Sequence, residues 1–186
     1  MKATLIILAG GKSSRMGFDK GLILHKGKHI TQYLIDVNAS LFSKVLISSN
    51  NKEYRRFKES VIPDTIIEIG PIGGIVSCLE KSTTDLNVFI SCDAPFINKE
   101  TLKKLLLKSI DSNADIVYSK HGNRTHPFPS CFNKRIFNKL NRLILSGERK
   151  MSSLSEFFKT DYVDFNNEKK DFFLNLNNPD DLKKIS

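Results

Sequence analysis

The sequence predicts an α/β fold in which a mostly parallel β-sheet carries helices on both faces, in three αβα layers. Short continuous apolar runs alternate with segments whose apolar residues recur at helical intervals, as in successive βαβ units. Polar residues and glycines gather directly after several of these runs, where such sheets bind ligands. Because no internal repeat or Pro-, Gly- or Ser-rich linker interrupts the chain, we expect residues 1–186 to form a single domain.

The first part of the chain shows this alternation clearly. Residues 3–8, ATLIIL, have no helical spacing and predict a strand buried on both faces. Residues 44–48, KVLIS, predict the second strand. Between the two strands, a helix is indicated by apolar residues at helical intervals: Ile30, Tyr33, Leu34, Val37 and Leu41.

The middle of the chain repeats the pattern. Residues 87–93, NVFISCD, predict a strand that ends in a carboxylate, and residues 114–119, ADIVYS, predict a further strand. The segment between them predicts a helix that starts near Asn98. Four apolar residues are expected on one face of that helix: Leu102, Leu105, Leu106 and Ile110.

The last part of the chain continues with shorter elements. We expect a helix over residues 134–145 and a small strand over residues 161–165, DYVDF. A final helix is expected after Asn178, which is a suitable N-cap, with Pro179 as its first residue.

The chain carries an excess of positive charge, with 29 Lys plus Arg against 20 Asp plus Glu and a formal net charge of +9. Such a charge favours anionic partners, or reflects a generally basic surface, and does not separate nucleic acids from nucleotides and anionic metabolites. RNA-binding proteins of this size usually combine basic residues with aromatic stacking motifs, and this sequence has none. We therefore expect no nucleic-acid partner.

Composition also indicates where the protein works. No apolar run approaches the roughly 20 residues that span a membrane, so no membrane partner is expected. The opening MKATLIILAGG imitates a signal peptide, but its apolar core is shorter than the usual 7 to about 15 residues and favours a buried strand. Cys78, Cys92 and Cys131 are odd in number and form no C-x-x-C pair, as expected of reduced thiols in a cytoplasmic protein.

The stretch LAGGKSSRMGFDKGL, residues 8–22, follows the first strand and suggests a phosphate-binding loop. The amides of Gly10 and Gly11 can approach phosphate oxygens closely, because no side chain intervenes. Arg15 adds a planar fork of donors and Lys20 a compact charge. The alternative is a flexible surface loop with incidental cations, but the complete pattern favours a cradle for a polyphosphate.

Two familiar phosphate loops are excluded by single residues in this stretch. A Walker A loop would need a glycine where Ile6 stands. A dinucleotide-binding fingerprint would need its second glycine where Lys12 stands. The loop therefore belongs to another class of phosphate-binding sequence.

The motif ISCDAPF places Asp93 after an apolar run that Pro95 then stops. Mg²⁺ commonly takes one or two protein carboxylates and completes its shell with phosphate and water, so one aspartate is enough to nominate a site. Asp93 is alternatively a turn former or N-cap. The Gly-rich loop after the first strand favours the metal site.

Two later segments carry polar groups with open interpretations. Residues 121–135, HGNRTHPFPSCFNKR, suit an anionic partner or form a basic antiparallel edge hairpin; a zinc site there would lack a fourth ligand beside its two histidines and Cys131. Asn175 and Asn177 lie two apart, so in an extended segment both amides point the same way, although Asx turns are an alternative use.

These motifs resemble the nucleotidyltransferases of sugar phosphates and cofactors, and LAGG followed by R-M-G-x-D-K is similar to the molybdenum cofactor guanylyltransferases of the MobA type. The resemblance covers nearly the whole chain and implies a Rossmann-like fold of the nucleotide-diphospho-sugar transferase type. Further landmarks follow in that family's order: Asp64 in VIPD, GPIGGI (70–75), CDAPF (92–96), HPFPSCF (126–132), GERKM (147–151) and LNLNNPDDL (174–182).

The resemblance implies an activity and a set of site residues. GMP would pass from GTP to molybdenum-bound molybdopterin, with pyrophosphate released and Mg²⁺ as cofactor. Further partners would be molybdoenzymes or their chaperones and other cofactor-biosynthesis proteins. Arg15, Lys20 and Asp93 would be catalytic, and Asp93 would hold the metal. The implied substrate-binding residues are Leu8, Ala9, Gly10, Gly11, Lys20, Ser48, Asn50, Asp64, Gly74, Asp93, His126, Asn175 and Asn177.

These implied residues divide between the two substrates. Asp64, alternatively only a turn residue after Pro63, would contact the nucleotide, while His126 and the two asparagines near the end would lie on the pterin side. The sequence departs from the family at Ser48: the family often has N-x-N after its second strand, so a hydroxyl stands here in place of the first amide.

Two other functions remain open from the residues alone. One is a related nucleotidyltransferase that uses CTP or another phosphate acceptor, and the other is a nucleotide-binding regulatory or chaperone-like module without catalysis. The presence of Arg15, Lys20 and Asp93 favours catalysis. The base and the acceptor rest on the resemblance.

Overall fold

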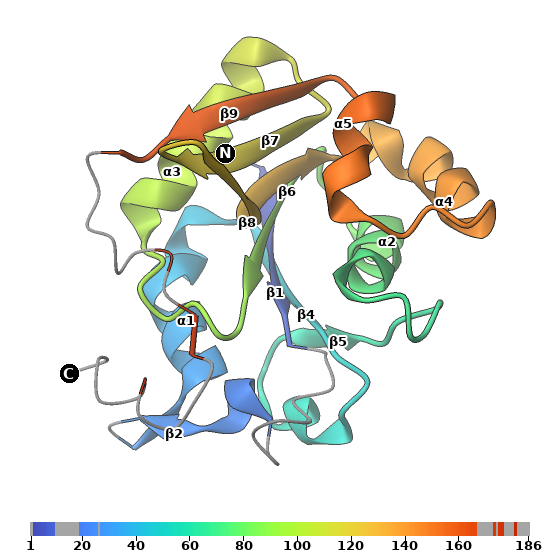
Figure 1. Cartoon of the computed structure of the whole chain (residues 1–186). Coiled ribbons are helices and arrows are strands. Elements are labelled where there is room, and N and C mark those ends of the chain that lie inside the picture. Colours follow the sequence, from blue (N-terminus) through green and yellow to red (C-terminus); the bar gives the residue numbers. More distant parts are fainter. Residues whose placement is uncertain are drawn as a thin grey trace.

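The computed structural model describes residues 2–9, 19–25, 27–166, 173, 175, 176 and 181. A seven-stranded sheet runs through them in the order β5-β4-β1-β6-β8-β7-β9 (Figure 1). Strand β8 is antiparallel to β6 and β7, and the other described pairs in this sheet are parallel. The α/β class with a mostly parallel sheet is therefore confirmed. The strands are β1 (Ala3–Leu8), β4 (Lys44–Ser48), β5 (Ser60–Ile62), β6 (Leu86–Ser91), β7 (Ile116–His121), β8 (Arg124–Asn133) and β9 (Thr160–Asp164).

Helices cover both faces of this sheet (Figure 1). Helices α1 (Ile30–Asn38) and α3 (Lys99–Ser112) pack on one face. Helices α2 (Pro71–Lys81), α4 (Phe137–Leu145) and α5 (Leu154–Phe157) pack on the other. The remaining short elements are η1 (Lys20–Leu22), β2 (Leu24–His25), β3 (Lys28–His29), η2 (Ala39–Leu41), η3 (Lys52–Arg56), η4 (Lys134–Ile136) and η5 (Met151–Ser153).

Strand β1 shows why a continuous apolar run forms the centre of this fold. Leu5 and Ile7 belong to the core beneath α1 and α3, whereas Ile6 and Leu8 belong to the core beneath α2 and α4. Successive side chains of a strand point to opposite faces, so every residue of a central strand needs an apolar partner. The run ATLIIL supplies an apolar residue at all but one of these positions.

The described part of the chain contains no helix long and apolar enough to span a membrane.

Most predicted elements are present, but several predictions are wrong in detail, including the end of the strand that carries Asp93 and the buried face of α3. Strand β6 ends at Ser91, so Asp93 lies two residues beyond it, in a turn where the Ala94 amide donates to the Ser91 carbonyl at 3.2 Å. On α3, Ile110 is 51% exposed. Ser109 is buried instead. Its hydroxyl can be buried because it donates to the Leu105 carbonyl of the same helix at 2.8 Å.

Several observed elements have no counterpart among the predictions, and the two that matter most for the site are α2 and β5. Helix α2 covers the glycine-rich segment GPIGGI, and its first helical residue is Pro71, which suits that position because no amide is needed there. Strand β5 has three residues, too few for a periodic signal.

The antiparallel hairpin considered as one alternative for residues 121–135 involves this segment as β8, which pairs with the preceding β7, but it is not at the edge of the sheet. Strand β8 lies between β6 and β7, and β9 follows β7 as the outer strand. The position of β9 depends on contacts between distant segments, which the local sequence pattern does not indicate. The predicted helix start at Asn178 and Pro179 lies outside the described residues.

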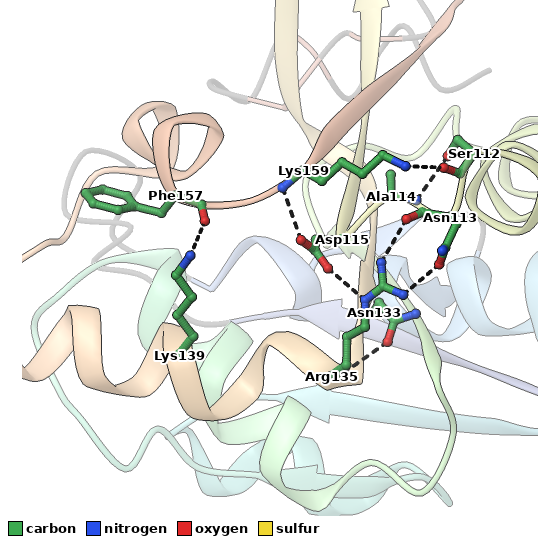
Figure 2. Close-up of polar contacts among 9 residues, drawn as sticks. All are labelled: Ser112, Asn113, Ala114, Asp115, Asn133, Arg135, Lys139, Phe157 and Lys159. Carbon is green, nitrogen blue, oxygen red and sulfur yellow. Dashed lines mark hydrogen bonds and ion pairs between the residues drawn. The ribbon is translucent and has the colours of Figure 1, made fainter.

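A polar network, here called the amino-edge network, joins segments at the edge where the parallel strands begin (Figure 2). Arg135 Nε donates to Asp115 Oδ1 at 2.7 Å, and its two terminal nitrogens donate to the side-chain and main-chain oxygens of Asn113. The backbone amide of Lys159 donates to Asp115 Oδ2 at 3.1 Å, and its ammonium donates to the Ser112 carbonyl at 2.8 Å. The network therefore ties the end of α3 to the starts of β7 and β9.

Candidate functional site

A cavity of about 1030 Å³ lies at the carboxyl ends of β1, β4 and β6. In the parallel register, Leu8 is opposite Ser48 on one side and Ser91 on the other, so the three strands end at the same level. Residues that follow these strands therefore meet around one space. The predicted site residues that line it are Leu8, Ala9, Ser48, Asn50, Asp64, Gly74, His126 and Asn175.

The other predicted site residues divide into two groups. Lys20 and Asp93 lie beside the cavity, linked to it through the lining residues Asp19 and Ser91. Gly10, Gly11, Arg15 and Asn177 lie outside the described residues.

One wall of the cavity holds Asp64 between two polar side chains. Ser48 Oγ donates to Asp64 Oδ1 at 3.2 Å, and Asn50 Oδ1 accepts from the Asp64 backbone amide at 2.9 Å. Burial raises the pKa of Asp64, and the hydrogen bond from Ser48 opposes that rise. In its ionised form this oriented carboxylate can accept hydrogen bonds from the N–H groups of a base.

Gly74 in α2 lies against this wall. A Cβ atom built there would overlap Ser48 Oγ and would lie 3.1 Å from Leu8 Cδ2 and 3.3 Å from Asp64 Oδ1. Glycine at this position therefore allows the helix to approach β1 and β4 closely enough for Ser48 and Asp64 to meet. In the same helix, burial raises the pKa of the Cys78 thiol to about 12.

An ion pair connects two segments that are 73 residues apart. Lys20 Nζ lies 3.1 Å from Asp93 Oδ2, and the two side chains are only 17% and 16% exposed. Asp93 is further fixed because Ser91 Oγ donates to its Oδ1 at 2.6 Å and its carbonyl accepts from the Leu176 amide at 2.8 Å. The structure thus brings together two of the three residues predicted to be catalytic.

The oxygen atoms of Asp93 fit a hard cation such as Mg²⁺. Each carboxylate oxygen accepts from one donor, Lys20 or Ser91, and a carboxylate has about four lone-pair sites in all. Among the described residues, no group of three or more His, Cys, Asp or Glu side chains is arranged to hold a metal. A cation at Asp93 would therefore take its other ligands from phosphate and water, which is common for Mg²⁺.

The side of the cavity formed by β8 is basic and aromatic. The ring of His126 stacks on Phe173, with centroids 3.9 Å apart and planes 17° apart. Burial lowers the pKa of His126, and the charges of Arg124 and His121 lower it further, which favours a neutral imidazole near pH 7. Together with the exposed Asn175, this side offers an aromatic platform and hydrogen-bonding groups.

Several lining residues were not predicted from the sequence. Asp19 lies within the Gly-rich stretch and Ser91 lies two residues before Asp93, so both have a local signal. Arg124 and Phe173 also line the cavity. Arg124 belongs to the segment HGNRTHPFPSCFNKR, whose cations indicated an anionic partner without singling it out, whereas Phe173 lies outside every motif.

Comparison with known proteins gives consistent matches over most of the chain. Residues 5–163 match the family described as the MobA-like NTP transferase domain. A molybdenum cofactor guanylyltransferase of Vibrio vulnificus is 35% identical over 184 residues, which are 97% of this chain and 93% of that protein.

Solved structures with the same arrangement of elements are more distant in sequence. A crystal structure of molybdopterin-guanine dinucleotide biosynthesis protein A from Archaeoglobus fulgidus has a TM-score of 0.82 and 24% identity, covering 97% of this chain and 95% of that one. The structure of CMP:2-keto-3-deoxy-manno-octonic acid synthetase complexed with CTP has a TM-score of 0.76 and 14% identity, covering 100% and 97%. At these identities, the likeness establishes the fold, which is the nucleotide-diphospho-sugar transferase type.

Proposed function

Because the chain belongs to the MobA-like NTP transferase family of nucleotidyltransferases, we propose that it transfers GMP from GTP to molybdenum-bound molybdopterin and releases pyrophosphate. The observation that carries this proposal is the cavity at the ends of β1, β4 and β6, with Asp64 on one wall and the Lys20–Asp93 pair beside it. A carboxylate that can accept hydrogen bonds from a base and an ion pair that can meet phosphates thus lie around one cavity.

The guanine base would lie against the wall formed by Ser48, Asn50, Asp64 and Gly74. The Asp64 carboxylate suits guanine because N1 and the exocyclic N2 of this base are both donors. Leu8 and Ala9 lead from this wall into the Gly-rich stretch. That stretch would place the amides of Gly10 and Gly11, with Arg15, on the triphosphate.

The reaction joins a phosphate oxygen of the molybdopterin to the α-phosphorus of GTP and breaks the bond between that phosphorus and the α–β bridging oxygen. A phosphate nucleophile is already ionised at pH 7, so alignment and charge stabilisation carry most of the catalysis without a general base. Lys20 would neutralise triphosphate charge as the leaving group departs. Mg²⁺ held by Asp93 would supply further neutralisation at the phosphates.

The acceptor would occupy the side of the cavity near β8. His126 and Asn175 line that side, and Asn177 would join them. Arg124 lies on the same side and suits the negative charge of the acceptor's phosphate. In this proposal the two substrates occupy separate sides of one cavity.

We also propose a cytoplasmic location and contact with molybdoenzymes or their chaperones, which would receive the product. Cys78, Cys92 and Cys131 are buried and free, a state that suits a reducing compartment. As a further proposal, residues 1–186 act as a single domain.

The test is mass spectrometry of the products after incubation of the protein with GTP, Mg²⁺ and molybdenum-bound molybdopterin. We expect the mass of molybdopterin guanine dinucleotide and an equal amount of pyrophosphate, and neither when Mg²⁺ is removed with EDTA. A product from CTP in place of GTP would identify a related nucleotidyltransferase. GTP binding without any product would identify a regulatory module.

A further inference from the structure

Asp19, which directly precedes Lys20, is held by three hydrogen bonds. The hydroxyl of Tyr54 donates to Asp19 Oδ1 at 2.5 Å, and the Gly21 amide donates to the same oxygen at 3.2 Å. Asn51 Nδ2 donates to Asp19 Oδ2 at 3.1 Å. Both carboxylate oxygens are therefore engaged, although Asp19 lines the cavity. We call these four residues, together with Thr31, the Asp19 clamp.

Tyr54 is a fully buried member of this clamp that comes from a distant segment. It lies in η3, between β4 and β5, and its side chain is fully buried. Burial is the main cause that raises its pKa, and the nearby carboxylate raises it further, so the phenol stays protonated and remains a donor. A buried hydrogen bond to a carboxylate is stronger than one between neutral groups.

The opposite side of the same backbone is held by α1. Thr31 Oγ1 donates to the Gly21 carbonyl at 2.9 Å. A Cβ atom at Gly21 would overlap the Tyr54 hydroxyl and lie 2.6 Å from Thr31 Oγ1, so the two hydroxyls pack directly on the glycine. The residues on either side of Lys20 are thus fixed from two elements of the fold.

We propose that Tyr54 is a positioning residue which, through Asp19, holds Lys20 where its ammonium meets Asp93 and the triphosphate. A lysine side chain has large rotamer freedom, and fixing its backbone on both sides limits the positions that the ammonium can reach. The clamp favours the observed position of the Lys20 ammonium, which lies 3.1 Å from Asp93 Oδ2. The inference rests on the proposed function, in which Lys20 contacts GTP.

The kinetic test compares Tyr54→Phe with Tyr118→Phe. Tyr118 is also buried, and its hydroxyl donates to the Met151 carbonyl at 3.4 Å, outside the cavity. We expect Tyr54→Phe to lower kcat about tenfold, the effect of losing one buried hydrogen bond to a charged group, and to leave the KM for molybdopterin unchanged. Tyr118→Phe should change neither. An unchanged kcat in Tyr54→Phe, as expected if Asp19 were instead a second metal ligand, would overturn the proposal.

A double variant separates positioning from a general loss of stability. If Tyr54 acts through Lys20, then adding Tyr54→Phe to Lys20→Ala should cause no further loss of kcat. An equal fold-loss in both backgrounds would contradict the proposal. If Tyr54→Phe fails to fold, Asn51→Ala removes another donor to Asp19 while leaving the buried ring in place, and the same comparison applies.

Hydrogen exchange at the Gly21 amide tests the clamp without any substrate. We expect exchange about tenfold faster in Tyr54→Phe, because Asp19 is then less firmly held, and unchanged exchange in Tyr118→Phe. Faster exchange in a protein that makes no dinucleotide would support the clamp and overturn the proposed function. Dinucleotide formation with unchanged exchange and unchanged kcat in Tyr54→Phe would overturn the clamp alone.

Discussion

Similar charged pairs have different roles at the two ends of the parallel strands, here called the amino edge and the carboxyl edge of the sheet. At the amino edge, Arg135 and Asp115 form an ion pair at 2.7 Å within a network that also fixes the end of α3 and the start of β9 (Figure 2). At the carboxyl edge, Lys20 and Asp93 form an ion pair at 3.1 Å beside a cavity of about 1030 Å³. The first pair joins segments of the fold, whereas the second lies where a ligand can reach it.

The type of cation fits this difference. The planar fork of Arg135 reaches three protein oxygens at once, which suits a fixed structural link. Lys20 carries a compact charge with three donors, so the ammonium that pairs with Asp93 can also contact a phosphate oxygen. The comparison predicts that substitutions at the carboxyl edge affect turnover and nucleotide binding, and that substitutions at the amino edge affect stability.

The largest effect is expected from Asp93→Asn. The amide keeps the shape of the side chain but removes the charge that would bind Mg²⁺ and pair with Lys20. We expect pyrophosphate release to fall about 100-fold or more. The matched control is Asp161→Asn, which removes an aspartate paired with Lys108 at 2.9 Å away from the cavity and should keep normal turnover. Full Mg²⁺-dependent turnover in Asp93→Asn would show that the metal is held elsewhere.

The next effect is expected from Gly74→Ala, which inserts a methyl group between α2 and the Ser48–Asp64 pair. We expect the affinity for GTP, measured by calorimetry, to fall about tenfold as this pair separates. Gly73→Ala in the same helix is the control, because its Cβ would meet the Ile66 carbonyl at 2.6 Å and should mainly lower thermal stability. Equal GTP affinity in Gly74→Ala and the unmodified protein would refute a role for this wall in nucleotide binding.

A smaller effect is expected from Arg135→Met, which removes the centre of the amino-edge network. Since Arg135 is partly exposed, we expect the free energy of unfolding in urea to fall by only about 1 kcal/mol. Turnover should stay normal when measured below the unfolding transition. A loss of turnover without a loss of stability would mean that the two edges are functionally coupled.

The smallest effect concerns the pH dependence of GTP binding. Burial raises the pKa of Asp64, so its folded form binds a proton more tightly than the unfolded chain does. Asp64 therefore stabilises the folded protein most at pH values below its pKa in the unfolded chain. This contribution is lost as the pH rises through the raised pKa of Asp64 in the folded protein. GTP binding has the opposite dependence, because it needs the ionised carboxylate and weakens as pH falls through the raised pKa.

Ser48→Ala removes the hydrogen bond that lowers the pKa of Asp64, so the acid limb of GTP binding should move to higher pH by less than about one unit. Calorimetric titrations over an acidic pH series measure this shift. Ser109→Ala, which removes a buried hydroxyl from α3, should leave the midpoint in place. A midpoint that does not move in Ser48→Ala would show that Asp64 does not control binding through its charge.

The fold was predictable where local pattern and burial agree. ATLIIL and KVLIS are continuous apolar runs, and both form strands at the predicted residues. Helix α2 was missed because GPIGGI contains helix-unfavourable glycines, one of which, Gly74, is required for close packing against Leu8 of β1 and Ser48 of β4. Ile110 was assigned to the buried face of α3 from its spacing, but it is 51% exposed and Ser109 is the buried residue at this end of the helix.

The candidate site was only partly predictable. A carboxylate after the strand NVFIS and polar groups after KVLIS indicated the correct edge of the sheet, because parallel strands bring their carboxyl ends together. The contacts within the site had no such signal. Tyr54 meets Asp19 only because η3 folds back beside η1, and Phe173 meets His126 only because a distant segment returns to β8.

The sequence by itself determined the fold class, the side of the sheet where the cavity lies and the chemical types of group available there. These features depend on periodicity and on residues that follow one another in the chain. The order β6-β8-β7-β9, the Lys20–Asp93 pair and the Asp19 clamp were decided only by the tertiary structure. The physical reason is that each depends on contacts between segments far apart in sequence, and those contacts exist only after the strands have taken their order in the sheet.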